Sequence, residues 1–321
     1  MPDYVLSVRR VNKDGKFENE PGKSRYLRVP GKRLPKVRYE IEKADWVQHV
    51  LKEAQTGTDD NGDPVGDVLF YVHGYNNSTE VVIRRHRQLK ENLEAVGYQG
   101  AVVSFDWPSD QKAINYLEDR TDAKISSLQL VTDGIMLLSK AQSKGCRINV
   151  HVLAHSMGAY VVREAFDDAD DRPAVASVAW TASQVCLAGA DISSRSMAAG
   201  SSKTSSLYRR SVRITNYYSR FDSVLKLSNV KRVGVARRLG RVGLPDVTSS
   251  KAVDIDCSNY FATLDEDAND FIGSFSHSWY IGDMTFIRDL YYTIQGDIDR
   301  NAIPTRDVRV ENRLELKALA V

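Results

Sequence analysis

The sequence predicts an α/β fold in which helices cover both faces of a mostly parallel central sheet. Residues 67–72 and 148–153 are mostly apolar segments of strand length, as expected of strands that are buried on both faces of a sheet. Strand patterns also alternate along the chain with amphipathic helix patterns, and this order produces parallel strands joined by crossover helices. With 321 residues and 42% hydrophobic content, the chain can bury a large core.

The first 43 residues are predicted to form a small strand-rich extension. This segment has twelve Lys and Arg against six Asp and Glu, an alternating stretch at 4–8, and prolines that interrupt its strand patterns. Residues 44–321 are predicted to form a single α/β domain. Its tail, residues 297–321, alternates again in hydrophobicity and is expected to pair with the N-terminal strands.

Hydrophobic spacing locates the remaining elements of the domain. Helical periodicity covers three segments, 46–54, 82–96 with Gly97 as its stop, and 125–138 with Gly145 as its stop. Further strand patterns occur at 101–105, 186–190 and 211–218.

The segment Ala154-His155-Ser156-Met157-Gly158 joins the strand at 148–153 to a helical pattern. A serine with small residues two places before and after it, at a strand-to-helix turn, is typical of a nucleophile elbow. There the serine takes a strained conformation that presents its hydroxyl at the sheet edge. Ala154 departs from the usual glycine by one methyl group. A helix N-cap serine gives a similar pattern, so Ser156 needs partners elsewhere in the chain to be a nucleophile.

His73-Gly74-Tyr75 directly follows the apolar strand at 67–72. A glycine there allows a turn tight enough to aim a backbone N–H group at a developing oxyanion. The predicted donors are the backbone N–H groups of Tyr75 and Met157. The side chain of His73 is predicted to be structural.

His277 is the candidate general base. Of the six histidines, it alone follows Ser156, and the chain order of this arrangement is serine, acid, histidine. It also precedes the last helical pattern of the domain, where a base of this kind is expected.

Asp222 is the preferred candidate for the acid, because it follows the strand at 211–218 and lies between Ser156 and His277 in the chain. Asp191, after the preceding strand, is the alternative. Asp106 precedes Ser156, so chain order disfavours it.

The ordered motifs resemble a bacterial branch of the α/β-hydrolase superfamily that is catalogued only as hydrolases of unknown function. The resemblance spans residues 67–280 and depends on the ordered set more than on any one motif. It implies a serine-hydrolase fold and triad but no substrate. This branch often has a serine where Asp106 stands, and the sequence leaves open whether Asp106 contacts the substrate. The motifs that carry the resemblance are His73-Gly74-Tyr75-Asn76, Ser104-Phe105-Asp106-Trp107-Pro108-Ser109, Ala154 to Gly158, Ala190-Asp191-Ile192, Asp222 with Leu225 to Ser228, and His277-Ser278-Trp279-Tyr280.

Composition excludes several classes of protein. A net charge of +2 argues against a nucleic-acid or membrane partner. Cys146, Cys186 and Cys257 are an odd number without CxxC spacing, which favours free thiols in a reducing compartment. Together with the lack of a signal-peptide or membrane-spanning pattern, this predicts a cytoplasmic protein.

Neither a metal nor a cofactor is expected. His151 and His155 have the four-residue spacing of a helical metal pair, but they lie on a predicted strand and lack the accompanying glutamate. Two basic segments, 193–211 and 231–241, could bind phosphate or nucleic acid. The near-neutral net charge favours a flexible connector and a solvated or pocket-rimming loop instead.

The expected function is hydrolysis of a small-molecule ester, thioester or lactone by Ser156, His277 and Asp222 through an acyl-enzyme intermediate. Asn76, Asn77 and Trp107 are candidates for lining the substrate pocket. Two alternatives remain, an acyltransferase with the same triad and a non-catalytic binding scaffold. The sequence does not determine acyl or alcohol specificity or the oligomeric state.

Overall fold

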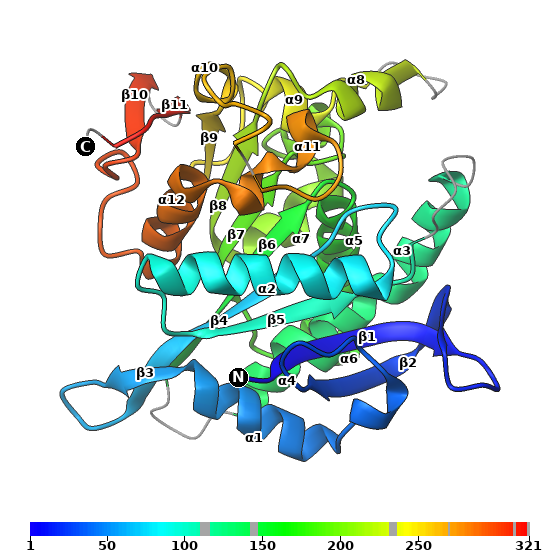
Figure 1. Ribbon diagram of the computed structural model, residues 1–321. Coiled ribbons are helices and arrows are strands. Elements are labelled where there is room, and N and C mark those ends of the chain that lie inside the picture. The colour runs from blue at the N-terminus through cyan, green and yellow to red at the C-terminus, as the bar shows by residue number, and fades with distance from the viewer. Residues whose placement is uncertain (110–115, 142–146, 231–235, 269, 311–312, 320–321) are drawn as a thin grey trace.

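The structure is a computed structural model that describes residues 1–109, 116–141, 147–230, 236–268, 270–310 and 313–319. Its centre is one 11-stranded sheet in the order β10-β11-β9-β8-β7-β6-β4-β5-β1-β2, with β3 paired to β4 (Figure 1). The strands are β1 (Asp3–Val11), β2 (Phe17–Val29), β3 (Gln55–Thr58), β4 (Pro64–Val72), β5 (Ala101–Asp106), β6 (Arg147–His155), β7 (Ala182–Ala188), β8 (Ser211–Tyr218), β9 (Ala252–Asp256), β10 (Arg306–Val310) and β11 (Arg313–Leu316).

Every neighbouring pair from β11 across to β1 is parallel. The pairs β1–β2, β3–β4 and β10–β11 are antiparallel. The predicted mostly parallel sheet is therefore confirmed.

Helices connect these strands across both faces of the sheet. The α-helices are α1 (Lys43–Ala54), α2 (Thr79–Ala95), α3 (Tyr116–Leu130), α4 (Met136–Ala141), α5 (Gly158–Asp170), α6 (Pro173–Ala176), α7 (Ser205–Arg209), α8 (Ser223–Val230), α9 (Leu239–Val242), α10 (Ser258–Phe261), α11 (Phe275–Ser278) and α12 (Met284–Gln295). The 3-10 and π turns are η1 (Val37–Tyr39), η2 (Val131–Ile135), η3 (Ser194–Met197), η4 (Ser202–Thr204) and η5 (Trp279–Gly282).

Local chemistry sets the ends of the long helices. Ser78 caps α2 by accepting a hydrogen bond from the Val81 N–H at 3.3 Å, and Gly97, with φ of +101°, follows its end. The predicted helix at 125–138 is divided between α3, the π turn η2 and α4. Its predicted stop, Gly145, lies outside the described residues.

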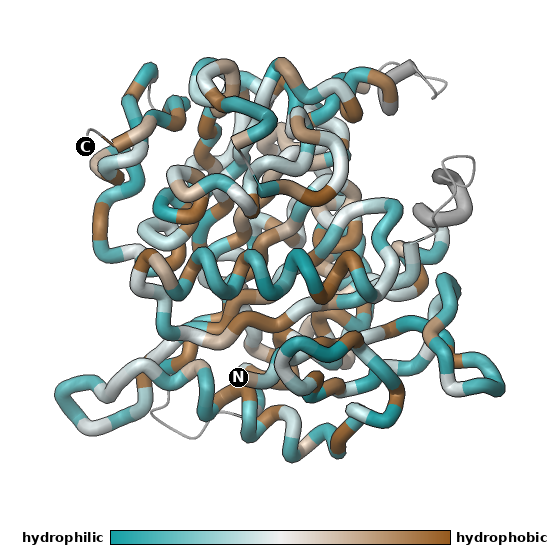
Figure 2. The backbone as a smooth tube through the Cα atoms, in the orientation of Figure 1, coloured by the Kyte–Doolittle hydropathy of each residue, from teal (hydrophilic) through white to brown (hydrophobic). Residues whose placement is uncertain are grey.

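The sheet separates two hydrophobic layers, and β4 shows how its strands supply both. Val68, Phe70 and Val72 face the layer that contains α1 and α5, whereas Leu69 and Tyr71 face the layer of α2 and α12. Figure 1 shows α2, α11 and α12 in front of the sheet and α5 and α7 behind it. In Figure 2 hydrophobic residues follow the central strands, while hydrophilic residues follow the outer face of α2 and the hairpin tips.

The two ends of the chain lie at opposite edges of this sheet. β1 and β2 form as strands, but β1 pairs with β5, so residues 1–43 extend the central sheet instead of standing apart from it. The expected pairing between the tail and the N-terminal strands does not form, because β11 adds to β9 at the far edge. β9 offers the tail a free edge, whereas β1 lies between β5 and β2, and the outer edge of β2 is bridged by Glu40 at Leu27.

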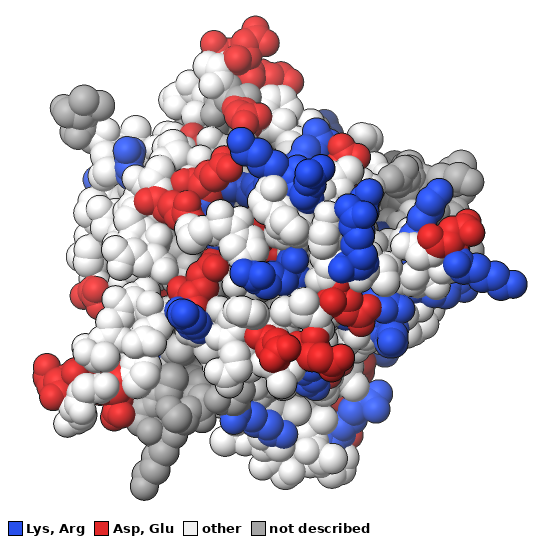
Figure 3. Space-filling view, turned by 60° about the horizontal axis from the view of Figure 1, so that its bottom comes forward, with Lys and Arg blue, Asp and Glu red and all other residues white. Residues whose placement is uncertain are grey.

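Charged side chains of both signs share the surface. On the face in Figure 3, Lys and Arg lie beside Asp and Glu. The excess of basic side chains in the first 43 residues is partly neutralised by acids outside this segment, such as Asp106, which pairs with Arg9 at 2.7 Å. None of the helices in the described ranges is both long enough and apolar enough to cross a bilayer.

Candidate active site

The loops that follow β4, β6, β7 and β8 meet at the carboxyl edge of the sheet, where parallel strands commonly present functional groups. They carry Tyr75, Ser156, Asp191 and Asp222, respectively, and His277 reaches the same edge from α11. Each residue that the sequence singled out for chemistry therefore lies at or next to one rim.

Ser156 occupies a strained turn between β6 and α5. Its φ of +56° is a left-handed value that non-glycine residues rarely adopt, at a typical cost of about 1–3 kcal/mol. The turn is held by the Ser156 N–H, which donates to the Ala188 carbonyl at 3.0 Å. The next residue but one must be small, because a Cβ on Gly158 would lie 2.3 Å from the Val72 carbonyl oxygen. This is the local geometry expected of a nucleophile elbow.

His277 and Asp222 form a buried hydrogen-bonded pair. Nδ1 of His277 donates to Oδ2 of Asp222 at 2.6 Å, and the other carboxylate oxygen accepts the Leu225 N–H at 2.9 Å. Asp222 is fully buried and His277 is 6% exposed. Because Nδ1 carries the proton that binds the carboxylate, neutral His277 has an unprotonated Nε2 that can accept another.

Two contacts bring His277 next to the serine turn. Gly189 directly follows Ala188, whose carbonyl accepts the Ser156 N–H. A Cβ on Gly189 would lie 3.4 Å from Cε1 and Nδ1 of His277. Nε2 of His155 also lies 2.8 Å from the His277 carbonyl oxygen. In the described part of the chain, the Ser156 hydroxyl and Nε2 of His277 make no hydrogen bond, and such bonds often tighten only with substrate bound.

Two backbone amides flank the serine, as expected of an oxyanion hole. The Met157 N–H is buried at the start of α5 and donates to no acceptor among the described residues, so it can serve a developing anion at a helix N-terminus. Tyr75 lies on the facing loop, which approaches so closely that a Cβ on Gly74 would lie 2.8 Å from Cβ of Ser156. Glycine at this position therefore permits the close approach.

The three residues expected to line a pocket occupy different environments. Asn76 is exposed, with φ of +58°, on the loop beside Tyr75. Asn77 is buried and its side-chain amide donates to the Gly74 and Tyr75 carbonyls at 2.8 and 2.9 Å. Trp107 is fully buried and its indole N–H donates to the His73 carbonyl at 2.8 Å. Asn77 and Trp107 thus support the loop from inside.

The remaining acid candidates have other partners. Asp191 faces Arg238, with Oδ1 and Nε 3.2 Å apart, and both side chains are buried. Asp106 is 1% exposed and accepts hydrogen bonds from Arg9 at 2.7 Å and Ser7 at 2.8 Å. Burial opposes ionisation of Asp106, but Arg9 and His73 more than offset it and lower its pKa. Asp106 is therefore held in an internal ion pair.

Arg9 is a residue that the sequence analysis missed. Its guanidinium joins Asp106 to the Asn77 carbonyl at 2.7 Å, so β1 braces the loop that carries Tyr75. The ring of His73 stacks on Trp107 behind this loop, with ring centroids 5.3 Å apart, and burial lowers its pKa. The available signal was the strand pattern of β1, in which Arg9 lies two residues after Ser7 and so on the same face.

Arg85 and His155 were also missed as parts of the site. Arg85 is 7% exposed and lies three residues after Val82 and four before Leu89, which are on the apolar face of α2. A charged residue within an apolar helical stripe was the signal that could have identified it.

The two basic segments are largely built into the fold. Residues 193–211 contain η3, η4 and α7 instead of a flexible connector. Arg241 donates to the Asp222 carbonyl at 2.8 Å, so part of the second segment supports the acid loop. Arg195 and Arg237 line a surface groove of about 830 Å³ beside it. Lys231 and Arg232 lie outside the described residues, as does Cys146, whereas Cys186 and Cys257 are buried free thiols.

Asp254 fastens the loop that follows the second basic segment to the sheet. Its carboxylate accepts hydrogen bonds from the Leu244 N–H at 2.7 Å and from the Asn216 amide at 2.6 Å. Burial raises the pKa of Asp254 to about 6. A folded pKa above the unfolded value means that the native state binds this proton more tightly, so stability falls as the pH rises through 6.

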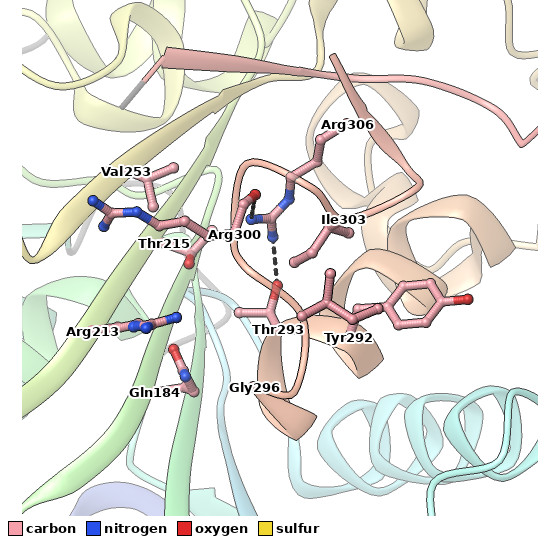
Figure 4. Close-up of a pocket in the computed structure, with 11 residues that line it drawn as sticks. Gln184, Arg213, Thr215, Val253, Tyr292, Thr293, Gly296, Arg300, Ile303 and Arg306 are labelled. Atoms are coloured by element: carbon pink, nitrogen blue, oxygen red, sulfur yellow. Dashed lines mark hydrogen bonds between the residues drawn. The ribbon is translucent and has the colours of Figure 1, made fainter. Parts of the chain in front are cut away.

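A small polar cavity lies at the opposite end of β7, β8 and β9 (Figure 4). Gln184 and Arg213 line it from near the starts of β7 and β8, far along these strands from the rim of Ser156. Its most buried cation, Arg306, is paired with Asp289 at 2.6 Å and contacts Thr293. Arg306 therefore holds α12 in place through this cavity, which takes no part in the candidate site.

Comparisons with known proteins agree with this fold. A family model described as "Alpha/beta hydrolase of unknown function (DUF900)" matches residues 50–265. An uncharacterised protein of Nostoc sp. (strain PCC 7120), alr1448, is 40% identical over 62 residues, which are 19% of this chain and 15% of that protein.

Two solved structures match this chain at low similarity. A putative hydrolase from Agrobacterium vitis S4 has 9% identity and a TM-score of 0.30, covering 59% of this chain and 78% of its own. A Trichoderma reesei cutinase in complex with a phosphonate inhibitor has 10% identity and a TM-score of 0.32, covering 79% of this chain and 86% of its own.

Proposed function

The chain belongs to the α/β-hydrolase family of unknown function DUF900, and on this premise we propose that it is a serine hydrolase of carboxylic esters or thioesters. One observation carries the proposal. A serine with φ of +56° lies at the same rim as a histidine whose Nδ1 is bound to a buried carboxylate at 2.6 Å. This combination supplies a nucleophile, a base and an orienting acid.

In the proposed reaction, Nε2 of His277 takes the proton from the Ser156 hydroxyl as its oxygen attacks the acyl carbonyl carbon. Asp222 fixes the ring so that Nδ1 carries a proton and Nε2 is free to accept one. It also stabilises the imidazolium that results. His277 then protonates the leaving alcohol or thiol, and an acyl-serine remains. Water releases the acyl group in a second attack with His277 again as base.

The oxyanion of each tetrahedral intermediate is proposed to bind the backbone N–H groups of Met157 and Tyr75. The buried position of Met157 at the start of a 13-residue helix supports this role. Loss of one such donor typically lowers turnover by about 10²–10³-fold. Asn76, exposed beside Tyr75, is the proposed substrate contact on this loop.

The test is to replace the nucleophile. Ser156→Ala is expected to reduce hydrolysis of p-nitrophenyl acetate to the background rate and to abolish labelling by a fluorophosphonate. Ser205→Ala, a change at a partly buried serine of α7, is the matched control and is expected to retain both. A Ser156→Ala protein that keeps labelling and hydrolysis would refute the assignment. A series of p-nitrophenyl esters of increasing chain length then defines the acyl specificity.

A further inference from the structure

The segment that carries His277 is held by side chains from two other elements. Its backbone is gripped from β6 by His155 and from α2 by Arg85, Gln88 and Asn92. These contacts lie on both sides of His277 in the chain, which suggests a device for positioning the base.

His155 is the last residue of β6 and directly precedes the nucleophile. Its Nε2 is 2.8 Å from the His277 carbonyl oxygen, which can only accept, so Nε2 carries the proton. Burial, together with the nearby His277 and Arg85, holds the pKa of His155 well below its usual range. The ring is therefore neutral, and its unprotonated Nδ1 faces the Arg85 guanidinium at 3.5 Å.

A tilted contact between the rings adds a second interaction between the same two residues. The His155 and His277 rings have centroids 4.8 Å apart and an interplanar angle of 46°. The side chain next to Ser156 thus fixes both the backbone and the ring of the proposed base. Nucleophile and base are linked by one residue.

Arg85 fixes the turn around this pair. Its Nη2 donates to the Ile272 carbonyl and lies 3.4 Å from the Ser278 hydroxyl. Gly273, at φ of +112°, leaves the room that the guanidinium needs, because a Cβ there would lie 3.1 Å from Nη2. Arg85 therefore contacts His155 and both flanks of His277 at once.

Two further residues of α2 continue this grip. Gln88 donates to the Asp270 carbonyl and Asn92 to the Ile281 carbonyl, each at 2.8 Å. With Arg85 they follow the spacing i, i+3 and i+7, so they lie along one face of the helix. One helix face thus binds the base segment at three carbonyls.

We propose that His155 and Arg85 are positioning residues for His277. This inference rests on the proposed function. His155 holds the base at the correct place relative to Ser156, and Arg85 holds His155 and the turn in register. Neither residue touches the substrate. A displacement of about 1 Å in a catalytic group can lower turnover by about 10²-fold, which sets the expected effect.

The experiment compares two variants of His155 with a matched histidine control. His155→Leu removes the N–H donor and is expected to lower kcat for p-nitrophenyl acetate by about 10²-fold, with KM changed by less than about threefold. His155→Gln returns an N–H donor at a similar reach and is expected to recover at least tenfold of that loss. The control is His151→Leu on the same strand, where the ring is 2% exposed and bound to Asp67 at 2.8 Å, away from the rim. It is expected to lower the melting temperature while kcat stays within about threefold.

Arg85 provides the second line of the test, which also applies if His155→Leu fails to fold. Arg85→Met is expected to lower kcat by at least about tenfold. Arg87→Met, on the same helix, removes an ion pair with Asp3 of β1 and is expected to leave kcat unchanged. Wild-type kcat retained in folded His155→Leu and Arg85→Met would overturn the positioning role. A loss equal to that of the control variants, without rescue by His155→Gln, would overturn it too. A different result would refute the proposed function, namely that Ser156→Ala hydrolyses p-nitrophenyl acetate as fast as the wild-type protein.

Discussion

Replacing Asp222 with asparagine tests the orientation of the base directly. Oδ1 of Asp222 accepts the Leu225 N–H at 2.9 Å, so the amide oxygen of the variant keeps that position. The amide nitrogen then takes the place of Oδ2, 2.6 Å from Nδ1 of His277. Two donors cannot face each other, so Nδ1 gives up its proton and the ring carries it on Nε2.

The wrong tautomer removes the base without removing its ring. Nε2 of His277 can no longer accept the proton of Ser156, and the equivalent change in a serine protease lowers turnover by about 10⁴-fold. At 1.36 kcal/mol for each factor of ten, this corresponds to about 5 kcal/mol of transition-state stabilisation. The fold is expected to change little, because the two side chains have nearly the same shape.

The matched control is Asp191→Asn, the other acid of the rim. Asp191 is paired with Arg238 at 3.2 Å, so its replacement is expected to lower the free energy of unfolding by about 1–3 kcal/mol and leave kcat within about threefold. Initial rates with p-nitrophenyl acetate and urea unfolding followed by circular dichroism measure both quantities. A kcat for Asp222→Asn within tenfold of wild type, or an equal loss in Asp191→Asn, would refute the assignment of the acid.

Two further predictions follow from close packing and from burial. Gly74→Ala places a Cβ 2.8 Å from Cβ of Ser156 and is expected to lower kcat by about 10²-fold. In the control Gly57→Ala the nearest atom to the new Cβ is 3.9 Å away, so kcat is expected to stay unchanged. Equal kcat values for the two variants would contradict the close packing of the Gly74 loop against Ser156. Asp254→Asn removes a buried carboxyl group whose pKa is raised to about 6. Oδ1 of Asn216, which has no hydrogen-bond partner among the described residues, can accept from the new amide when the Asn216 side-chain amide rotates. Between pH 4 and pH 7, the free energy of unfolding of this variant is expected to rise by about 3 kcal/mol relative to that of wild type, as measured by urea unfolding. A difference between the two proteins that does not change with pH would argue against the raised pKa.

The sequence was sufficient to predict the parallel sheet and the serine turn, because both depend on local patterns. β4 and β6 are mostly apolar, and strands of that kind are typically covered on both faces. The small residues around Ser156 are needed wherever a strand and a helix approach this closely, as Gly158 shows with its 2.3 Å limit. Both requirements concern residues that are neighbours in the sequence, so they can be recognised without a structure.

Chain order was enough to nominate His277, and strand position together with chain order favoured Asp222 over Asp191. It could not show which carboxylate faces the ring, since both follow a strand that ends at the same rim. The tertiary structure separates them, because Asp222 is bound to His277 while Asp191 faces Arg238.

The supporting residues could be found only in the folded chain. Arg9 reaches Asn77 across 68 positions, and Arg85 reaches Ile272 across 187. The pairing of the strands at the two ends of the chain could also not be predicted from the sequence, because pairing of distant strands depends on which edges the other strands leave free. Local sequence thus determined the elements and the serine turn, while the partners of each buried charge were decided by tertiary packing, since no local pattern encodes a contact between distant segments.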